Sequence, residues 1–287
     1  MPQDADRRRL RRGYGWGKGP GMSLATLIGF VAGIILFLGS IVIATDNYLA
    51  FIDFPSFLMV VGGTFASTFI SYEPRYVMQA FRLMTSIFFA PKIQRGVLQG
   101  EVGRCIRWGY LIQKTGLNAL EADTVKLKKQ DRFLGFGVDL VIAGYTGPEV
   151  RQILTNSIET SFQRNCVPAD ILRNMAGTAP AYGMIGTLIG LIIMLGQMGS
   201  DPAALGPGMA VALITTLYGV LLPRLMLLPA ASKIQQREEI VRFRNYLVAE
   251  GLCLLAERKN PRFIQDAMNS FLDPSIHFDI DKQMKNK

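Results

Sequence analysis

The stretches APAYGMIGTLIGLIIML at Ala179–Leu195 and GPGMAVALITTLYGVLLP at Gly206–Pro223 decide the fold of this 287-residue chain. Both are apolar and uncharged, and they belong to a set of four segments without any Asp, Glu, Lys or Arg. These segments are Gly19–Thr45, Phe54–Tyr72, Asn174–Ser200 and Pro202–Pro223. About 20 consecutive apolar residues are enough for a helix to cross a bilayer. The sequence therefore predicts an all-α membrane protein with four transmembrane helices.

Composition supports a membrane protein, because 49% of the residues are hydrophobic and only 18% are charged. The formal net charge of +9 is compatible with either a nucleic-acid or a membrane-surface partner. The three cysteines are far apart and show neither a disulfide framework nor metal-ligand spacing. We therefore expect them to be reduced and inert.

The basic residues lie before the first apolar segment, between the second and third, and from Arg224 onward. The short linkers at Asp46–Asp53 and Asp201 contain none. The positive-inside rule therefore places both termini and the long middle segment in the cytoplasm. It also favours membrane lipid, and not nucleic acid, as the partner of the basic surface.

The N-terminal arm, residues 1–21, contains RRRLRR at Arg7–Arg12 and alternating glycines. We interpret it as a flexible arm that lies against anionic lipid headgroups. The alternatives are a secretory or twin-arginine signal with a weak cleavage site near Thr45, and nucleic-acid binding. The apolar segment that follows is longer than a normal signal core, which argues against a signal.

The segments between the spans have helical periodicity and no long strand-like alternation. Val77, Phe81, Met84, Ile87 and Phe88 share one helix face. Gly144–Pro148 and Pro168 are expected to punctuate the helices, and Asn260-Pro261 to separate two helices of the tail. We expect one helical cytoplasmic domain formed by the loop between spans 2 and 3 and by the C-terminal tail. The expected parts are the arm 1–21, spans 22–72, the middle domain 73–173, spans 174–229, and the C-terminal helices and tail 230–287.

Enzyme chemistry is not apparent. There is no P-loop, H-E-x-x-H or G-x-S-x-G motif, and the single histidine, His277, lies in a polar tail. We expect neither catalysis nor a bound cofactor or metal. The four apolar segments also contain no carboxylate, Lys or His, although ion-coupled membrane machines keep an ionisable group inside the membrane. If this chain couples to an ion gradient, the titrating group must come from a partner.

The spans do contain small and hydroxyl-bearing residues. Gly29 and Gly33 have GxxxG spacing, and Gly183, Gly186 and Gly190 recur in the third span; tight helix packing is the simpler interpretation of all five. The threonines of spans three and four could bond to a carbonyl one turn back, or complete the oxygen shell of a cation such as sodium. Prolines near the ends of these spans either end or kink helices, or form a hinge. They are Pro180, Pro223 and Pro229.

The two quoted stretches closely resemble the MotA/PomA family of flagellar stator subunits. The resemblance extends from MSLATLIGF at Met22, through FPSFLMVVGGTF at Phe54–Phe65, to NPRFI at Asn260–Ile264. It implies a homopentamer in the bacterial inner membrane around two copies of a single-span MotB or PomB partner. In this family the partner's membrane aspartate carries the ion and its periplasmic part binds peptidoglycan. Ion flow then turns the pentamer, which drives the rotor protein FliG.

Residue by residue, the resemblance implies an ion pathway at Thr187 and Thr216, with Thr215 beside it. Asp53 matches an acidic residue thought to lie near the path by which the ion enters, although it could simply cap a helix. The coupling prolines of the family match Pro180 and Pro229. A threonine at position 187 favours transport of Na⁺ over H⁺, because sodium needs several oxygen ligands whereas a proton can sit on the carboxylate alone.

The rotor-facing helix of the family falls on QKTGLNALEAD, which keeps Lys114 and Glu121. It carries Gln113 where the family usually has a basic residue, and Ala122 and the following Thr124 replace acidic residues that some members have. Arg107 and Asp123 are candidates for compensating charges, although a solvated surface would look the same. Two other functions stay open: a TolQ/ExbB-like proton-channel subunit, whose family has three spans and an outside N-terminus, and a transporter or channel that conducts alone.

Overall fold

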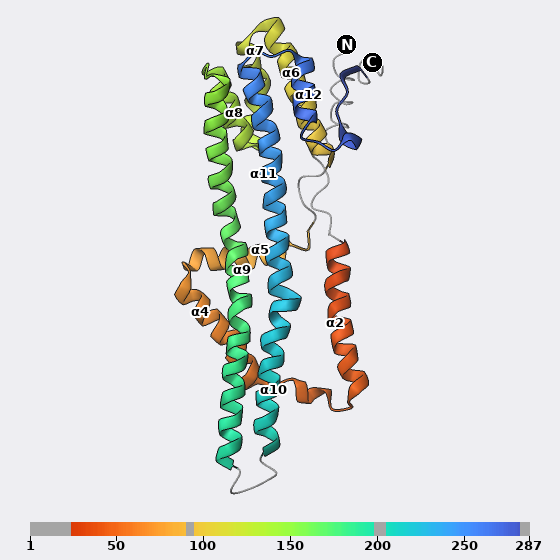
Figure 1. The fold of residues 1–287 in the computed structure, drawn as a ribbon, viewed down its shortest axis with the longest axis vertical. Helices are drawn as coiled ribbons and strands as arrows, with labels where there is room; N and C mark the ends of the chain where they lie inside the picture. The colour runs from red at the N-terminus through yellow and green to blue at the C-terminus, as the bar shows by residue number, and fades with distance from the viewer. Residues whose placement is uncertain (1–23, 90–94, 198–204, 282–287) are drawn as a thin grey trace. The chain divides into compact units, whose positions relative to one another are not determined.

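The computed structural model describes residues 24–89, 95–197 and 205–281, and these residues are almost entirely helical (Figure 1). No strand occurs in these ranges, so the predicted all-α class is confirmed. Four helical segments are long and apolar enough to cross a membrane. The N-terminal arm and the loop around Asp201 lie outside the described residues.

The chain separates into two compact units. The membrane unit comprises Gly21–Ala90 and Asn165–Arg237, and the polar unit comprises Pro91–Arg164 and Glu238–Lys287. As expected, the polar unit combines the middle segment with the C-terminal tail. Two of the boundaries between the units, after Arg164 and after Arg237, fall within the long helices α9 (Gly147–Gln197) and α11 (Leu228–Ala256).

The membrane unit begins with α2 (Leu24–Ala44) and a short 3₁₀ turn, η1 (Tyr48–Phe51). The second span consists of α3 (Phe54–Phe57), the π-helical η2 (Leu58–Gly62) and α4 (Gly63–Ser71). The remaining elements of the membrane unit are α5 (Pro74–Ser86), part of α9 (Gly147–Gln197), α10 (Leu205–Leu222), the π-helical η4 (Pro223–Leu227) and the start of α11 (Leu228–Ala256).

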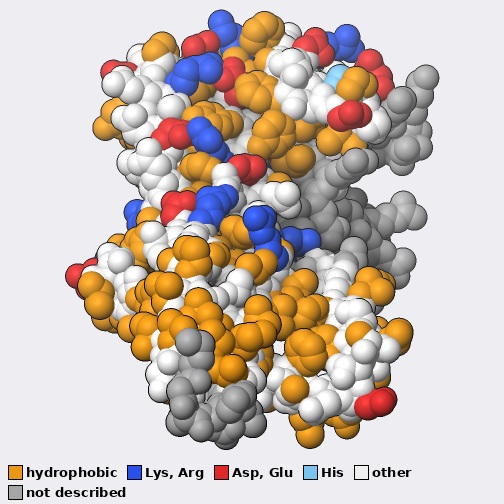
Figure 2. All heavy atoms as spheres, turned by 60° about the horizontal axis from the view of Figure 1, so that its bottom comes forward, with side chains coloured by type: hydrophobic (Ala, Val, Ile, Leu, Met, Phe, Trp, Pro, Cys, Tyr) orange, Lys and Arg blue, Asp and Glu red, His pale blue; other side chains and the backbone are white. Residues whose placement is uncertain are grey.

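Hydrophobic side chains cover most of the visible face of the membrane unit, as Figure 2 shows. On α2, for example, Ile43 is 90% exposed and Leu36 is 74% exposed. An apolar surface of this extent is unfavourable in water and favourable in lipid. The charge-free parts of α9 and α10, residues 174–197 and 205–222, therefore lie in the bilayer together with α2 and the second span.

Helix α5 is the amphipathic helix expected after the second span, and it runs crosswise to α9 (Figure 1). Pro74 stands at its first position, where the missing N–H costs nothing. Val77 and Ala80 are fully buried. Arg237 of α11 donates to the carbonyls of Ser86 and Ile87, at 2.9 Å each, and to that of Phe89. The end of α5 is thus capped by a guanidinium from a distant helix.

The polar unit contains α6 (Arg95–Thr115), α7 (Leu117–Gln130), α8 (Arg132–Ile142), the remainders of α9 and α11, α12 (Pro261–Asn269) and the 3₁₀ turn η5 (Pro274–Ile276). Trp108, Leu134 and Leu252 are among its fully buried core residues. A Cβ at Gly137 would lie 2.4 Å from the Cδ1 atom of Leu252, so any larger residue there would force the Leu252 side chain of α11 to move. The expected helix break at Asn260-Pro261 is confirmed: Asn260 caps α12 through a bond from Arg262 N.

Candidate functional site

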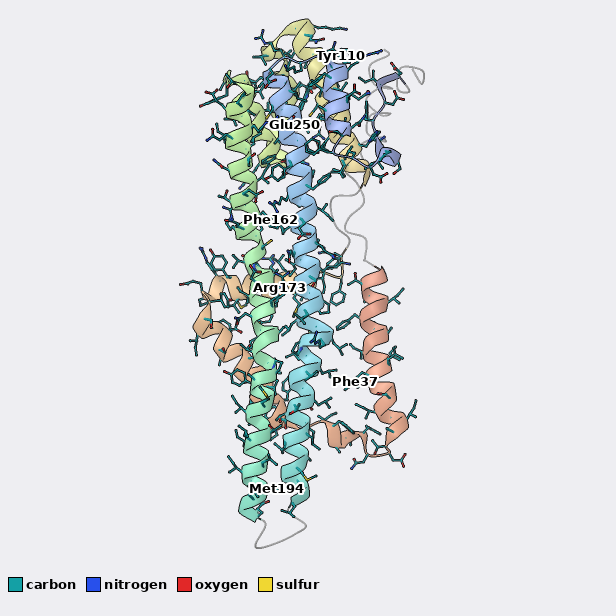
Figure 3. All side chains as sticks on the ribbon, viewed as in Figure 1. Phe37, Tyr110, Phe162, Arg173, Met194 and Glu250 are labelled. Atoms are coloured by element: carbon teal, nitrogen blue, oxygen red, sulfur yellow. The ribbon has the colours of Figure 1, made fainter. Side chains whose placement is uncertain are left out.

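The third and fourth spans form an antiparallel pair, the α9–α10 seam, in which backbones touch. A Cβ at Gly190 would lie 2.7 Å from the carbonyl oxygen of Gly208 and 2.8 Å from the nitrogen of Ala212. A Cβ at Gly186 would lie 2.5 Å from the side chain of Thr215. Met194, near the end of α9 (Figure 3), continues the seam against Gly208. Tight packing is therefore the correct interpretation of the third-span glycines.

The same interpretation is wrong for Gly29 and Gly33 within this chain. A Cβ at Gly29 would meet nothing within 4 Å, and one at Gly33 would make an ordinary 3.5 Å contact with Leu225. The physical reason is that α2 has little packing against the rest of the membrane unit and none of its candidate span is buried. The two glycines of α2 therefore leave open space beside this helix and do not mediate a close contact with another helix of the same chain.

Thr215 is fully buried in the seam, and its hydroxyl donates to the carbonyls of Val211 and Ala212 at 3.0 Å each. Thr187 is only half-buried and donates to the carbonyl of Met184 at 2.6 Å. Thr216 is exposed, with a 3.4 Å bond to Ala212 O. All three hydroxyls thus bond one turn back along their own helix, as the simpler interpretation predicted. Their protons are used there, so each oxygen is left as an acceptor.

Helix geometry puts Thr187 and Thr216 on the same side of the seam. Gly186 faces Thr215, and each candidate threonine follows one of these two residues. Successive residues turn by about 100° around a helix, and in an antiparallel pair this turn leads to the same side on both helices. Two acceptor oxygens therefore share one face of the α9–α10 pair. The charge-free stretches of the four spans contain no Asp, Glu, Lys, Arg or His among their described residues.

Asp53 caps α3: its carboxylate accepts from Ser56 N at 2.9 Å and from the Ser56 hydroxyl. This is the simple helix-cap role, and a part in the ion's path stays a prediction. The backbone beside it is held by Tyr218 of α10, whose hydroxyl donates to Phe51 O at 2.6 Å and accepts from Asp53 N at 3.2 Å. Tyr218 was not singled out from the sequence, because only the fold brings positions so far apart together.

The candidate prolines do not end the helices that contain them. Helix α9 runs unbroken through Pro180, whose Cα would be 3.3 Å from a Cβ at Gly219 on α10. After α10, the π-helix η4 begins at Pro223, and Leu228 N bonds back to Pro223 O. Pro229 follows in the first turn of α11. Prolines remove helical hydrogen bonds, and π segments recur at functional sites; a hinge role for Pro180 and Pro229 stays a prediction.

The predicted rotor-contact residues Lys114, Glu121, Arg107 and Asp123 are all exposed on the polar unit. Arg107 and Asp123 form a loose ion pair at 3.4 Å, and Trp108 Nε1 donates to the same carboxylate at 2.8 Å. A hollow of about 250 Å³ is lined by Arg107 and Asp123 together with Lys114 and Tyr110, the last of which is labelled in Figure 3. Glu121 does not line it. The structure thus brings three of the four candidates together.

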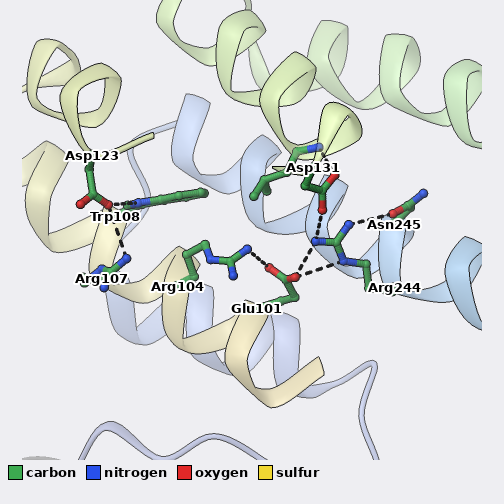
Figure 4. A network of polar contacts seen from close by, with 9 residues as sticks. Glu101, Arg104, Arg107, Trp108, Asp123, Asp131, Arg244 and Asn245 are labelled. Atoms are coloured by element: carbon green, nitrogen blue, oxygen red, sulfur yellow. Dashed lines mark hydrogen bonds and ion pairs between the residues drawn. The ribbon is translucent and has the colours of Figure 1, made fainter. Parts of the chain in front are cut away.

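A buried ionic network of the polar unit was missed by sequence reasoning (Figure 4). Glu101 is 3% exposed and binds Arg104 and Arg244 at 2.5 Å each, and Arg244 also binds Asp131 at 2.5 Å. Burial disfavours the charge on Arg244, but the two carboxylates outweigh burial and raise the pKa of its guanidinium. Asp131 also caps α8 through Leu134 N. The network therefore fixes α6, α8 and α11 together within the polar unit.

Comparisons with known proteins agree with this architecture. Residues 126–246 match the model of the MotA/TolQ/ExbB proton channel family. Motility protein A of Cereibacter sphaeroides is 33% identical over 93% of this chain and 99% of its own length. Chemotaxis protein PomA of Vibrio alginolyticus is 30% identical over 88% of this chain and 96% of its own.

Among solved structures, one described as C. jejuni MotAB superimposes with a TM-score of 0.78 at 21% identity, covering 88% of this chain and 97% of that one. This likeness confirms the fold. The relatives are named for motility and ion conduction and not for catalysis, which confirms that the chain is not an enzyme. With relatives that are 30% and 33% identical over 88% and 93% of its length, the chain belongs to the MotA/TolQ/ExbB proton channel family.

Proposed function

We propose that the chain is the ion-conducting, rotor-engaging subunit of a bacterial flagellar stator, of the MotA/PomA type. One observation carries the proposal: Thr187 and Thr216 present acceptor oxygens on one face of a tightly packed helix pair that has no charge carrier of its own. Such a face is suited to a cation or a protonated carboxyl group that another subunit brings into the membrane. The motility names of relatives that span nearly the whole chain support the same function.

The proposed assembly is a homopentamer in the inner membrane around two copies of a MotB/PomB-type partner, with both termini in the cytoplasm. The partner supplies the membrane carboxylate, because the described spans contain none. The exposed charges Arg107, Lys114, Glu121 and Asp123 are proposed to contact the rotor protein FliG. Co-purification with a single-span, peptidoglycan-binding protein, followed by counting both subunits, tests this assembly.

Sodium is the proposed ion. Its dehydrated shell needs several oxygen ligands, and the Thr187 oxygen has its lone pairs free because its proton is bonded to Met184 O. Swimming speed should rise with external sodium at constant pH. Motility that does not respond to sodium would show that protons drive this motor.

Isosteric variants test the two oxygens directly. Thr187→Val and Thr216→Val keep the side-chain shape but remove the oxygen, so ion flux through the complex with its partner should fall while assembly persists. Thr215→Val is the matched control, since the buried Thr215 faces Gly186 and not the exposed side of the seam. Unchanged flux in both test variants would refute the proposed pathway.

A TolQ/ExbB-like subunit that energises periplasmic or outer-membrane processes is the alternative within the same family. Four candidate spans, where that group has three, argue against it. A channel that conducts alone is a further alternative. Flux assays with and without the partner separate it from the stator, because strong flux from the isolated chain would defeat the stator proposal.

A further inference from the structure

A pocket of about 560 Å³ lies inside the membrane unit, where the start of α2, the end of α5 and the η4–α11 junction meet. Its walls are mainly apolar and include Phe30 and Phe88, whose rings meet edge to face at 5.4 Å. Two basic residues, Arg224 and Lys233, also line it. No acidic residue is among the residues that line it.

The two cations have no anionic partner in the described chain. Lys233 Nζ donates to the Thr26 hydroxyl at 2.7 Å, and this neutral partner leaves its charge without a carboxylate among the described residues. Arg224 is exposed and is the first charged residue after the fourth apolar segment. It therefore lies where the spanning part ends and lipid headgroups begin. An apolar pocket with two uncompensated cations at that level has the chemistry to hold an anionic amphiphile.

We infer that this pocket binds one anionic phospholipid, with its phosphate against Arg224 and Lys233 and its acyl chain beside Gly29 and Phe30. The basic N-terminal arm carries the same sign of charge as the pocket and would be repelled. A zwitterionic lipid offers no net charge to the two cations. Each basic residue near the surface of an anionic membrane favours binding by about fivefold.

Gly29 gives the pocket its open wall. A Cβ there would meet nothing within 4 Å, so a substituted side chain begins in open space at the pocket wall. We expect Gly29→Leu to narrow the pocket. Gly39→Leu is the matched control, because Gly39 lies on the same helix, has equally open surroundings and does not line the pocket.

The test uses the full chain with its partner, purified in detergent, and native mass spectrometry with dioleoyl phosphatidylglycerol or dioleoyl phosphatidylcholine. Wild type and Gly39→Leu should retain about one phosphatidylglycerol per chain and much less phosphatidylcholine. Gly29→Leu should retain several-fold less phosphatidylglycerol. The double variant Arg224→Gln/Lys233→Gln should lose about 25-fold in affinity if both charges act, whereas Arg75→Gln, on α5 outside the pocket, should bind as wild type.

Four outcomes would overturn the inference. Equal retention of phosphatidylcholine and phosphatidylglycerol would show that the pocket does not select for lipid charge. An equal loss of phosphatidylglycerol in Arg75→Gln would show that any surface charge has this effect. Displacement of the lipid by millimolar inorganic phosphate would indicate a soluble-anion site. Loss of the oligomer in Gly29→Leu would show that a second copy of the chain, and not a lipid, fills the pocket.

Discussion

Adding one methyl group to α9 should have opposite effects at two positions. At Gly190 the new Cβ would lie 2.7–2.9 Å from Gly208 O and from the backbone and Cβ of Ala212. Backbone atoms cannot rotate away as a flexible side chain can, so the two helices must separate. Overpacking of this kind costs about 1–3 kcal/mol. At Gly177 a Cβ would meet nothing within 4 Å, and Gly177→Ala should stabilise the helix by about 0.5–1 kcal/mol.

The assay is thermal unfolding of the full chain in detergent, followed by circular dichroism. At about 2–4 °C per kcal/mol for a chain of this size, Gly190→Ala should lower the apparent melting temperature by several degrees. Gly177→Ala should raise it by about 1–4 °C. If Gly190→Ala melts at the same temperature as the wild-type chain, α9 and α10 do not touch through their backbones at this seam. A destabilised Gly177→Ala would show that the surroundings of Gly177 are packed and not open.

Three further predictions concern groups outside the spans. Glu101→Gln should destabilise the chain by about 3–5 kcal/mol, because it leaves the buried Arg244 short of a counter-charge, whereas Glu121→Gln, at an exposed site, should change the denaturation midpoint little. Burial raises the pKa of the Cys105 thiol from 9.0 to about 12; iodoacetamide should not label it in the folded chain, and the free energy of unfolding should fall as pH rises from 9.0 towards 12, where only the unfolded thiol ionises. Arg237→Gln should speed hydrogen exchange at the end of α5, since charged hydrogen bonds of about 1.5–3 kcal/mol each are lost.

The spans were predictable because the bilayer imposes a rule on local sequence: a crossing helix excludes charge over its whole length. The positions where helices begin and end inside the membrane unit were less predictable. Pro168 was expected to punctuate the chain, yet α9 continues through it and through Pro180 for 51 residues. A proline removes only one hydrogen bond and kinks a helix more readily than it ends one, especially where a neighbouring helix holds both sides.

The polar network and the Tyr218 contact were not predictable from one sequence. Glu101 and Arg244 are separated by 143 residues, and nothing local to either position indicates the other. Arg104, one turn from Glu101, could have drawn attention to a charged pair on a mostly apolar helix face. Tertiary structure also decides which glycines pack against another helix. Gly29 and Gly190 both lie in apolar spans, but Gly29 faces open space whereas Gly190 faces the backbone of α10.

The direction of the threonine hydrogen bonds bears on how ion binding could be coupled to movement. Thr187 donates its proton to Met184 O, so its oxygen can face a cation or a protonated carboxyl group but repels a bare carboxylate. Under the proposed function, the partner's carboxylate would therefore approach this face only when loaded with its ion. Thr187→Ser keeps this oxygen and should retain flux that Thr187→Val loses. The seam would then act through an acceptor that selects the loaded state, and it needs no charge of its own to do so.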